Sequence, residues 1–240
     1  MSKDRKLIPK ASTLMGSLRS MGYSFESAVA DVIDNSISSH AQNVRVLFPT
    51  SPMDEVALGF LDDGDGMSKE VLFEAMRYGS FSAEEERAED DLGRFGMGLK
   101  SASLSQCRCL TVVSFDGDNL NGFTWDYNHI LEIEDWMIQE LSINEIDALP
   151  YIEKLKIQSK GTLVIWQDFD VISKSSGGQV YSTLIDLRNS LENTLALIFH
   201  RFLSGIGNIR LHIYLNELDI KPMDPFLEQH PKTTIKKKSN

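Results

Sequence analysis

The sequence predicts an α/β two-layer sandwich, in which a mixed, mostly antiparallel sheet is covered by helices on one face. Helical periodicity alternates with short apolar runs along the first half of the chain, which indicates helices and strands within one domain. The strands that follow Arg108 are separated by hairpin turns, and this pattern disfavours a parallel sheet of the Rossmann type. The chain has 240 residues, 42% of them hydrophobic, which is sufficient for one large domain with its own core.

Composition and charge exclude several classes of protein. The formal net charge of −11 disfavours a non-specific DNA-binding protein. No apolar stretch reaches the roughly 18 residues of a membrane helix, and the first residues lack the apolar segment of a signal peptide. The two cysteines, Cys107 and Cys109, are too close for a comfortable disulfide and lack companions for a zinc site. We therefore expect a cytoplasmic protein with reduced thiols and no association with membranes.

Two helices are expected near the N-terminus. The first covers residues 12–21, and the second covers residues 25–41, with Ser24 as its N-cap. Apolar side chains recur at three- and four-residue steps along the second helix, while Asp31 and Asn35 lie one turn apart on a different face. A carboxylate and a carboxamide in this arrangement can serve a hydrated cation, or a water poised to attack a bound phosphate. The alternative interpretation is a solvated helix face.

Two strands are expected over residues 43–49 and 55–62, and the second ends in a polar, glycine-rich turn. Asp62 lies at the end of this strand, where a fixed carboxylate can accept a hydrogen bond from an exocyclic amine such as that of adenine. Gly64 and Gly66 follow, and residues without a Cβ let a ligand approach the main chain closely. An acidic calcium-binding turn is the alternative, although the sequence lacks the later ligands and flanking helices of an EF-hand.

A third helix is expected over residues 68–79, followed by a polar, acidic loop. Residues 93–102, GRFGMGLKSA, then place three glycines before a helical pattern, with Lys100 in its first turn. Flexible backbone N–H groups at the positive end of a helix dipole suit a polyphosphate, and the lysine adds a full positive charge. The pattern is neither the P-loop nor the dinucleotide-binding fingerprint.

Strands dominate the remainder of the chain. Gly161 begins a buried strand in which Thr162 would lie beside Asp62 if the two strands are neighbours. The alternative for Thr162 is a β-branched strand residue without a functional role. A hairpin is expected over residues 108–127, and an ambiguous region with a strand and a short helix over residues 130–157. A long helix is expected over residues 181–202, and a closing hairpin over residues 209–226.

Three signatures therefore stand in one order along the chain. They are D-x-x-D-N on the second helix, D-x-G-x-G after a strand, and G-x-x-G-x-G-L-K after a polar loop, with Gly161-Thr162 behind them. This order resembles the gyrase B/Hsp90/histidine kinase/MutL (GHKL) superfamily of ATPases. The MORC-like branch is the most similar, because of the segments GRFGMGLKSAS and DIKPMDPF. The resemblance covers about residues 12–226 and implies a Bergerat-type ATP-binding fold.

The resemblance also implies how the chain is divided. Residues 1–226 would form the ATPase domain, in which residues 1–21 are a dimerisation arm and residues 78–95 are a lid that orders when nucleotide binds. Residues 227–240 would be a polar, basic tail. In related dimeric proteins a transducer domain begins near this point and supplies a second lysine to the nucleotide.

Individual residues take roles from the same resemblance. Asn35 matches the asparagine that coordinates Mg²⁺ beside the triphosphate, Asp62 the aspartate that binds the adenine amine, and Thr162 the threonine that shares a bridging water. Lys100 matches a phosphate-contacting lysine with a catalytic role. The general base of the superfamily is usually glutamate, but the matching residue is Asp31, which is one methylene shorter. The other matching ATP-contacting positions are Gly64, Gly66, Met67, Gly93, Phe95, Gly96, Met97, Gly98 and Leu99.

These residues imply Mg²⁺-dependent ATP binding and slow ATP hydrolysis, which drive lid closure and dimerisation of a molecular clamp or switch. The implied partners are ATP, Mg²⁺, a second copy of the chain and, by family analogy alone, a DNA-associated protein. A non-hydrolysing nucleotide sensor is one alternative, because Asp31 is short for a general base. A histidine-kinase-type phosphotransferase is another, and none of the five histidines has the sequence context of a phospho-acceptor.

Overall fold

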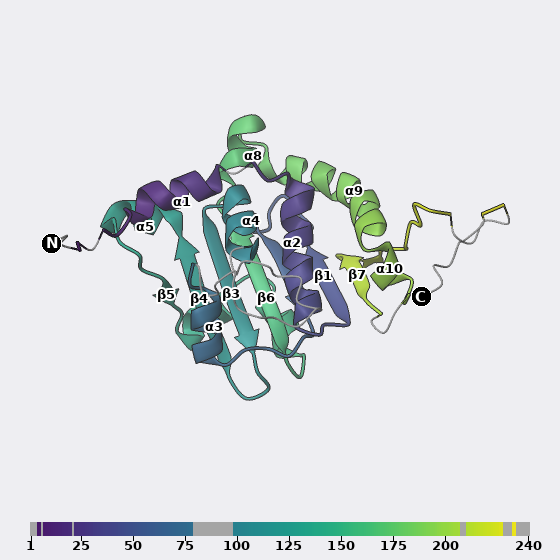
Figure 1. Ribbon diagram of the computed structural model, residues 1–240, viewed down its shortest axis with the longest axis horizontal. Coiled ribbons are helices and arrows are strands. Elements are labelled where there is room, and N and C mark those ends of the chain that lie inside the picture. Colours follow the sequence, from purple (N-terminus) through teal and green to yellow (C-terminus); the bar gives the residue numbers. More distant parts are fainter. Residues whose placement is uncertain are drawn as a thin grey trace.

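The computed structural model describes residues 4–5, 7–20, 22–78, 98–206, 210–227 and 232–233. Within these residues the chain folds into one sheet with helices packed against it, as Figure 1 shows. The helices are α1 (Ala11–Arg19), α2 (Phe25–Ser38), α3 (Lys69–Ala75), α4 (Gly98–Gln106), α5 (Tyr127–Ile133), α6 (Ile143–Asp147), α7 (Ile152–Lys156), α8 (Asp170–Ser175), α9 (Val180–Ile198) and α10 (His200–Leu203). The strands are β1 (Asn43–Leu47), β2 (Leu58–Asp62), β3 (Cys109–Phe115), β4 (Leu120–Asp126), β5 (Gln139–Glu140), β6 (Gly161–Gln167), β7 (His212–Leu215) and β8 (Leu218–Asp219).

The eight strands form one sheet in the order β5-β4-β3-β6-β2-β1-β7-β8. Within the described residues, every neighbouring pair is antiparallel except β1 and β7, which run parallel. Strands β3 and β4 form the hairpin that was expected after Arg108. The predicted α/β sandwich with a mixed, mostly antiparallel sheet is therefore confirmed. The expectation that helices cover one face alone is not met, because α6 and α7 pack on the other face.

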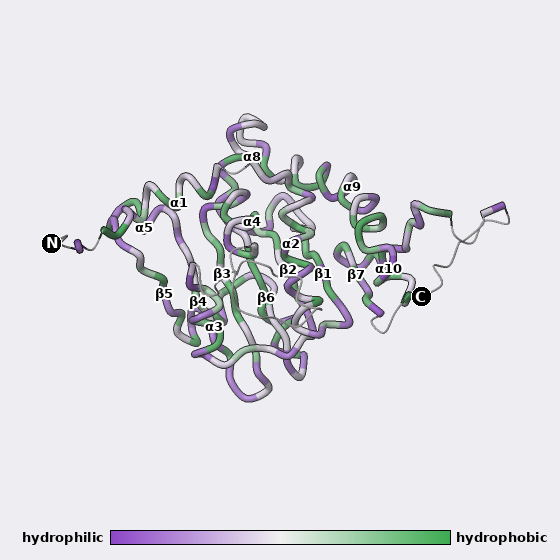
Figure 2. The backbone as a smooth tube through the Cα atoms, in the orientation of Figure 1, coloured by the Kyte–Doolittle hydropathy of each residue, from purple (hydrophilic) through white to green (hydrophobic). Residues whose placement is uncertain are grey.

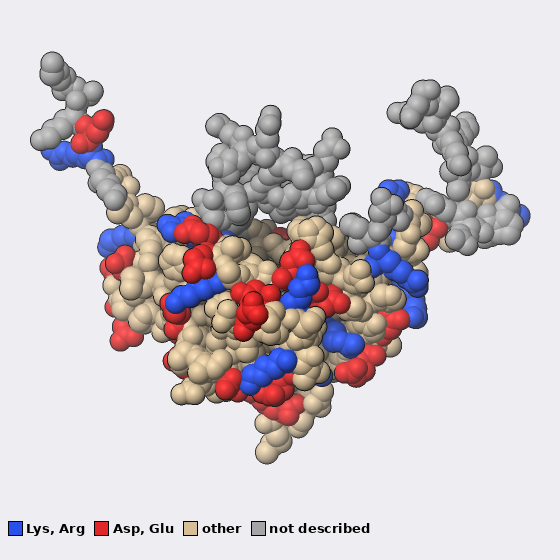
Figure 3. Space-filling view, turned by 90° about the horizontal axis from the view of Figure 1, so that it is seen from below, with Lys and Arg blue, Asp and Glu red and all other residues tan. Residues whose placement is uncertain are grey.

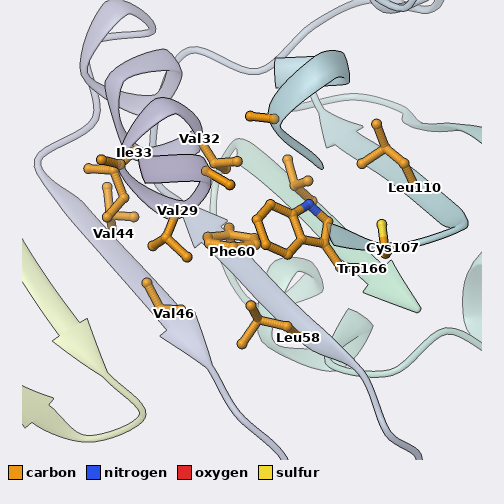
Figure 4. Close-up of a cluster of buried hydrophobic side chains, with 14 of the residues drawn as sticks. Val29, Val32, Ile33, Val44, Val46, Leu58, Phe60, Cys107, Leu110 and Trp166 are labelled. Carbon is orange, nitrogen blue, oxygen red and sulfur yellow. The ribbon is translucent and has the colours of Figure 1, made fainter. Parts of the chain in front are cut away.

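Helix α2 packs across the centre of the sheet. The side chain of Ser24 accepts a hydrogen bond from the Ser27 N–H group, which confirms the predicted N-cap. Val29, Val32 and Ile33 point from the helix toward the strands and are buried. The strand residues that lie against them in Figure 4 are Val44, Val46, Leu58, Phe60 and Trp166. The apolar stripe that predicted this helix is thus the side that builds the core.

A smaller apolar cluster lies on the opposite face of the sheet. It joins Leu61 of β2 and Leu163 of β6 to Ile146 of α6 and Leu155 of α7. Both helices come from residues 130–157, where the sequence indicated a strand and one short helix. The structure instead places the end of α5, then β5, α6 and α7 in this region. Helices of five residues contain too few turns to produce a recognisable periodic pattern.

The long helix that was expected over residues 181–202 is divided at Phe199. Helix α9 ends at Ile198 and α10 begins at His200, while the buried Phe199 between them has φ −95° and ψ 15°. The apolar pattern continues across this break, because both helices bury side chains in the same core. The sequence therefore does not reveal the break, because the same side of both helices stays buried.

The distribution of hydropathy agrees with this architecture. Figure 2 shows hydrophobic residues concentrated on the central strands and on the helix sides that meet them. Both cysteines are free, as expected, and Cys107 is buried whereas Cys109 is half-buried. In the part of the chain that the structure describes, no helix has the length and apolar character needed to cross a membrane.

Candidate functional site

Three neighbouring strands place a row of polar side chains on the face of the sheet that α2 covers. Asp62 is the last residue of β2 and pairs with Thr162 of β6, which in turn pairs with Ser114 of β3. Strand alternation puts all three on the face that also carries Phe60 and Val164. All three polar residues are buried. The sequence placed Thr162 beside Asp62 on the condition that their strands are neighbours, and the register satisfies this condition.

The carboxylate of Asp62 is held by three hydrogen bonds. The Ser36 hydroxyl donates to Oδ2 at 2.9 Å, and the N–H groups of Gly64 and Thr162 donate to Oδ1 at 2.9 and 3.3 Å. Asp62 is 5% exposed, and burial raises its pKa to about 6, so the carboxylate is mostly ionised at pH 7. A carboxylate accepts about four hydrogen bonds. Within the described residues, one acceptor position on Oδ2 is therefore left for the N–H group of a ligand.

The two glycines after Asp62 are required by the packing of the chain itself. A Cβ on Gly64 would lie 2.7 Å from the carbonyl oxygen of Ser39. A Cβ on Gly66, which has φ +70°, would lie 2.1 Å from the carbonyl oxygen of Phe115. The sequence interpretation was that these glycines admit a ligand to the main chain. Close approach of the protein's own backbone already accounts for both positions.

The polar face of α2 points toward the N-terminus of α4. A Cβ on Gly98 would lie 3.9 Å from Asp31 Oδ2, which places this carboxylate at the first turn of α4. The side-chain amide of Asn35 donates to the backbone carbonyl of Asp31, and no hydrogen bond within the described residues engages Asn35 Oδ1. Burial and the negative charge of Asp31 raise the pKa of Asp34 to about 6. Burial and the same charge also raise the pKa of Tyr23. The Asp31 carboxylate thus lies beside a helix N-terminus, and Asp34 and Asn35 lie one turn further along α2.

Lys100 lies in the first turn of α4, but its ammonium group contacts α3. The residue is 2% exposed, and Nζ donates to the carbonyl oxygen of Ala75 at 2.6 Å. Nζ also lies 5.9 Å from the centroid of the Tyr78 ring. Burial lowers the pKa of Lys100 to about 8, and no neighbouring carboxylate offsets this effect within the described residues. The sequence assigned Lys100 to a phosphate, and the structure places it at the C-terminal end of α3, within the same layer of helices.

The other predicted site residues divide into two groups. Met67 donates its N–H group to Ser114 Oγ at 2.9 Å, and the side chains of Met67 and Leu99 pack, partly buried, against the core. Of the predicted lid at 78–95, the structure describes only the first residue. The predicted loop positions that lie outside the described residues are Gly93, Phe95, Gly96 and Met97. No sequence motif indicated Ser36 or Ser114, because their importance depends on a neighbouring helix and on the strand register.

Two cavities lined by described residues lie away from Asp62. One lies where β6 leads into α8 and the start of α9, and the other lies between α1, α3 and β4, beside Trp125 and Trp136. No group of three or more His, Cys, Asp or Glu side chains in the described part of the chain can hold a metal ion.

A comparison with known protein families matches the part of the chain that contains this site. A family model described as "Histidine kinase-, DNA gyrase B-, and HSP90-like ATPase" matches residues 23–162, more than half of the chain. The match begins just before α2 and ends at Thr162, so that it contains Asp31, Asn35 and Asp62. No curated protein matches the chain.

Proposed function

This chain belongs to the histidine kinase-, DNA gyrase B- and HSP90-like ATPase family, and from this premise we propose that it binds Mg²⁺–ATP and hydrolyses it slowly. Membership of the family indicates ATP as the ligand. The residues around Asp62 and Asp31 indicate how the chain would bind and hydrolyse it. In the proposed cycle, ATP closes the lid at 78–95 and brings two chains together as a molecular clamp or switch. The MORC-like branch of the family is part of the proposal and rests on the motifs around Lys100 and before Phe226.

The environment of Asp62 is the observation that carries the proposal. A buried carboxylate with one unused acceptor position on Oδ2 is suited to the exocyclic amine of adenine, which donates hydrogen bonds. The carboxylate is mostly ionised at pH 7, because its pKa is about 6. Thr162 lies directly beside Asp62 across the β2–β6 pair and can hold a water between its hydroxyl and the base.

The triphosphate would lie between α2 and the N-terminus of α4. Backbone N–H groups and the helix dipole favour anions there, and Lys100 in the first turn of α4 can add its charge after it leaves the carbonyl of Ala75. Asn35 Oδ1 would supply one protein ligand to Mg²⁺, with phosphate and water oxygens as the others. When bound, Mg²⁺ neutralises phosphate charge.

Asp31 is the proposed general base. Its carboxylate takes a proton from water as the water oxygen bonds to the γ-phosphorus, and the bond from that phosphorus to the β–γ bridging oxygen breaks to release ADP. Asp31 Oδ2 lies near Gly98 at the N-terminus of α4, where the γ-phosphate is expected. The shorter side chain supports a slow reaction, because a misplacement of about 1 Å can lower the rate on the order of 100-fold. The same feature favours the alternative, a nucleotide sensor that does not hydrolyse ATP.

Binding and turnover measurements test this proposal directly. Wild-type protein is expected to bind Mg²⁺–ATP and to release phosphate, whereas Asp62→Asn should lose binding and Asp31→Ala should retain binding without release. Asp118→Asn is the matched control, because Asp118 is an exposed aspartate in the β3–β4 turn. A wild type that binds no ATP contradicts the proposal. A wild type that binds ATP and releases no phosphate identifies the sensor instead.

The clamp is tested separately by light scattering. We expect a non-hydrolysable ATP analogue with Mg²⁺ to convert a monomer into a dimer, and Asp62→Asn to remain monomeric under the same conditions. A monomer with and without the analogue would exclude ATP-driven dimerisation.

A DNA-associated partner is proposed only by family analogy, since acidic and basic side chains are interspersed on the face shown in Figure 3.

A further inference from the structure

Ser114 of β3 lies one strand beyond Thr162 in the row of polar residues that begins at Asp62. It is completely buried, and the function proposed above gives it no role. A hydroxyl at 0% exposure in the middle of a sheet needs partners, because an unpaired buried polar group is unfavourable. Its partners lie near the ends of β3 and β6 that border the proposed nucleotide site.

Three polar groups surround the Ser114 hydroxyl. The Met67 N–H group donates to Oγ at 2.9 Å, Thr162 Oγ1 lies 2.9 Å away, and the Gly161 carbonyl oxygen lies 3.2 Å away. A serine hydroxyl donates one hydrogen bond and accepts two. The Gly161 oxygen can only accept. All three contacts are therefore hydrogen bonds only when Ser114 donates to Gly161 and Thr162 donates to Ser114.

We infer that Ser114 is a positioning residue for the base-binding end of the nucleotide site, an inference that rests on the function proposed above. Because Ser114 accepts the hydrogen bond of the Thr162 hydroxyl, the lone pairs of the Thr162 oxygen remain available as acceptors beside the carboxylate of Asp62. Because Ser114 also accepts a hydrogen bond from the Met67 N–H group, it anchors the loop that carries Gly64.

The arrangement suits a 6-aminopurine. Its exocyclic amine donates directly to Asp62, while ring nitrogen N1 is an acceptor and cannot bond directly to a second acceptor. A water that donates one hydrogen to N1 and the other to Thr162 completes the contact. Removal of the Ser114 hydroxyl would free the Thr162 proton and leave the Met67 N–H group without its partner. The bound base would lose both the fixed orientation of Thr162 and the fixed position of the loop.

Thr111 of the same strand provides a matched comparison. Its hydroxyl is also buried and lies 2.8 Å from Thr124 Oγ1 in the neighbouring strand. Strand alternation directs Thr111 to the opposite face of the sheet, away from Asp62. The variants Ser114→Ala and Thr111→Val each remove one buried hydroxyl that is bonded across two strands. Only the first removes a group that contacts the proposed site.

The test compares two ligands by displacement of a fluorescent ATP analogue. Mg²⁺–ATP presents base and phosphates, whereas Mg²⁺–tripolyphosphate presents phosphates alone. Ser114→Ala should weaken ATP binding about tenfold and leave tripolyphosphate binding unchanged. Thr111→Val should change neither, and Ser114→Thr, which keeps the hydroxyl, should retain most of the ATP affinity. Unfolding temperatures of all variants show whether each one is folded.

Several outcomes would overturn the inference. Equal losses for both ligands, equal effects of Ser114→Ala and Thr111→Val, or unchanged ATP binding each assign the hydroxyl a purely structural role. A second measurement repeats Ser114→Ala in the background of Thr162→Val. The loss of ATP affinity caused by Ser114→Ala should be smaller there, because the contact between Ser114 and the Thr162 hydroxyl is already absent. Losses that add fully contradict the inference. A wild type that binds no ATP refutes the proposed function itself, so the two failures are distinguishable.

Discussion

Lys100 combines a positive charge with almost complete burial, and the two properties oppose each other. Its ammonium group has one carbonyl and one aromatic ring as described partners, and burial lowers its pKa to about 8. A lysine whose pKa is lower in the folded than in the unfolded protein destabilises the fold at every pH at which the folded protein carries the charged form. Such a group is retained when function needs it, and an incoming phosphate would supply the missing negative partner.

The variant Lys100→Met should therefore separate stability from binding. We expect the free energy of unfolding at pH 7 to rise by about 1–3 kcal/mol, because the desolvated charge disappears. ATP affinity should fall about tenfold or more, because a charge-assisted contact to phosphate is lost. Wild-type stability should also rise as the pH increases from about 8 to 10.5, where only the unfolded chain holds the extra proton.

Urea unfolding between pH 7 and 10.5, together with calorimetric titration, measures both effects. Lys10→Met is the control, because the Lys10 side chain is 74% exposed and lies 3.9 Å from its acidic partner. A loss of stability in Lys100→Met without a loss of affinity would show that Lys100 serves the fold alone.

Asp62 should make adenine binding dependent on pH. Its pKa is about 6, so below this value the protonated carboxyl loses acceptor capacity for the adenine amine. We expect ATP affinity to fall as the pH decreases from 7 to 5. Between pH 3.8 and 6 the folded protein holds this proton more tightly than the unfolded chain, so the contribution of Asp62 to stability decreases as the pH rises through this window.

Calorimetric titrations across this range check the effect on binding. The phosphates of ATP also gain protons near pH 6, so a phosphate contribution must be subtracted. Mg²⁺–tripolyphosphate, which has no base, reports that contribution on the same protein. Parallel pH profiles for the two ligands would mean that Asp62 does not contact the base.

Single residues also show where sequence reasoning is limited. Asp62 and Thr162 were identified because each stands at an end of a recognisable strand, and the register brings them together. Ser114 occupies a strand position that resembles any other, and only the pairing of β3 with β6 gives it a place in the site. The contact of Lys100 with Ala75 depends on where α3 ends relative to α4, which no local pattern specifies.

At the scale of elements, α1 is held to the body by a buried ionic cluster. Asp170 of α8 accepts from Arg19 of α1 at 2.5 Å and lies 3.1 Å from Nε of Arg108. The side chains of Arg19 and Asp170 are only 8% and 14% exposed. Both guanidinium groups also lie over the ring of Tyr127, at 4.9 and 5.6 Å from its centroid. The cluster therefore joins the proposed dimerisation arm to the nucleotide-binding layer.

This cluster predicts that loss of its aspartate destabilises the protein more than loss of one of its arginines. Asp170→Ala should lower the free energy of unfolding by about 2–4 kcal/mol, because it leaves the largely buried guanidinium of Arg19 and the half-buried guanidinium of Arg108 without this carboxylate. Arg19→Met should have a smaller effect, since Asp170 keeps Arg108 as its partner. Urea unfolding of both variants measures the difference, with Asp118→Asn as an exposed control. Equal losses would mean that the two arginines do not share Asp170.

Elements were predictable where their signals are local. Helix α2 carries its own cap at Ser24 and its own apolar stripe, and the β3–β4 hairpin carries its own turn. Helices α6 and α7 are stabilised by the second face of the sheet, where Ile146 and Leu155 are buried. Their formation depends on tertiary packing rather than on local propensity, and the sequence over 130–157 consequently remained ambiguous.

At the scale of the whole molecule, the site is built from the middle of the sheet. Asp62, Thr162 and Ser114 come from β2, β6 and β3, which are flanked on both sides by further strands. The order of these strands depends on contacts between segments about 50 to 100 residues apart, and no single-sequence pattern reports such contacts. The family resemblance supplied this long-range information, which is why the proposed site residues could be named more completely than periodicity alone allows.

A central site predicts a localised response to nucleotide. A ligand that binds only the folded state at 100 times its Kd stabilises it by about 2.7 kcal/mol. Hydrogen exchange should slow most at the N–H groups that build the site, those of Gly64, Met67 and Thr162, because their acceptors are Asp62 and Ser114. Strands β5 and β8 lie at the two edges of the sheet and contribute nothing to the site, so their exchange should change little.

Hydrogen-exchange mass spectrometry with a non-hydrolysable ATP analogue measures this pattern, and the analogue removes any effect of turnover. Peptides that cover residues 58–67 and 160–166 report on the site, and peptides over 137–142 and 212–220 report on the edges. Mg²⁺–tripolyphosphate serves as the ligand without a base and should protect α4 more than β2 or β6. Protection confined to the edge strands would place the nucleotide elsewhere on the molecule. Uniform protection would instead indicate global stabilisation, in which the row from Asp62 to Ser114 has no special part.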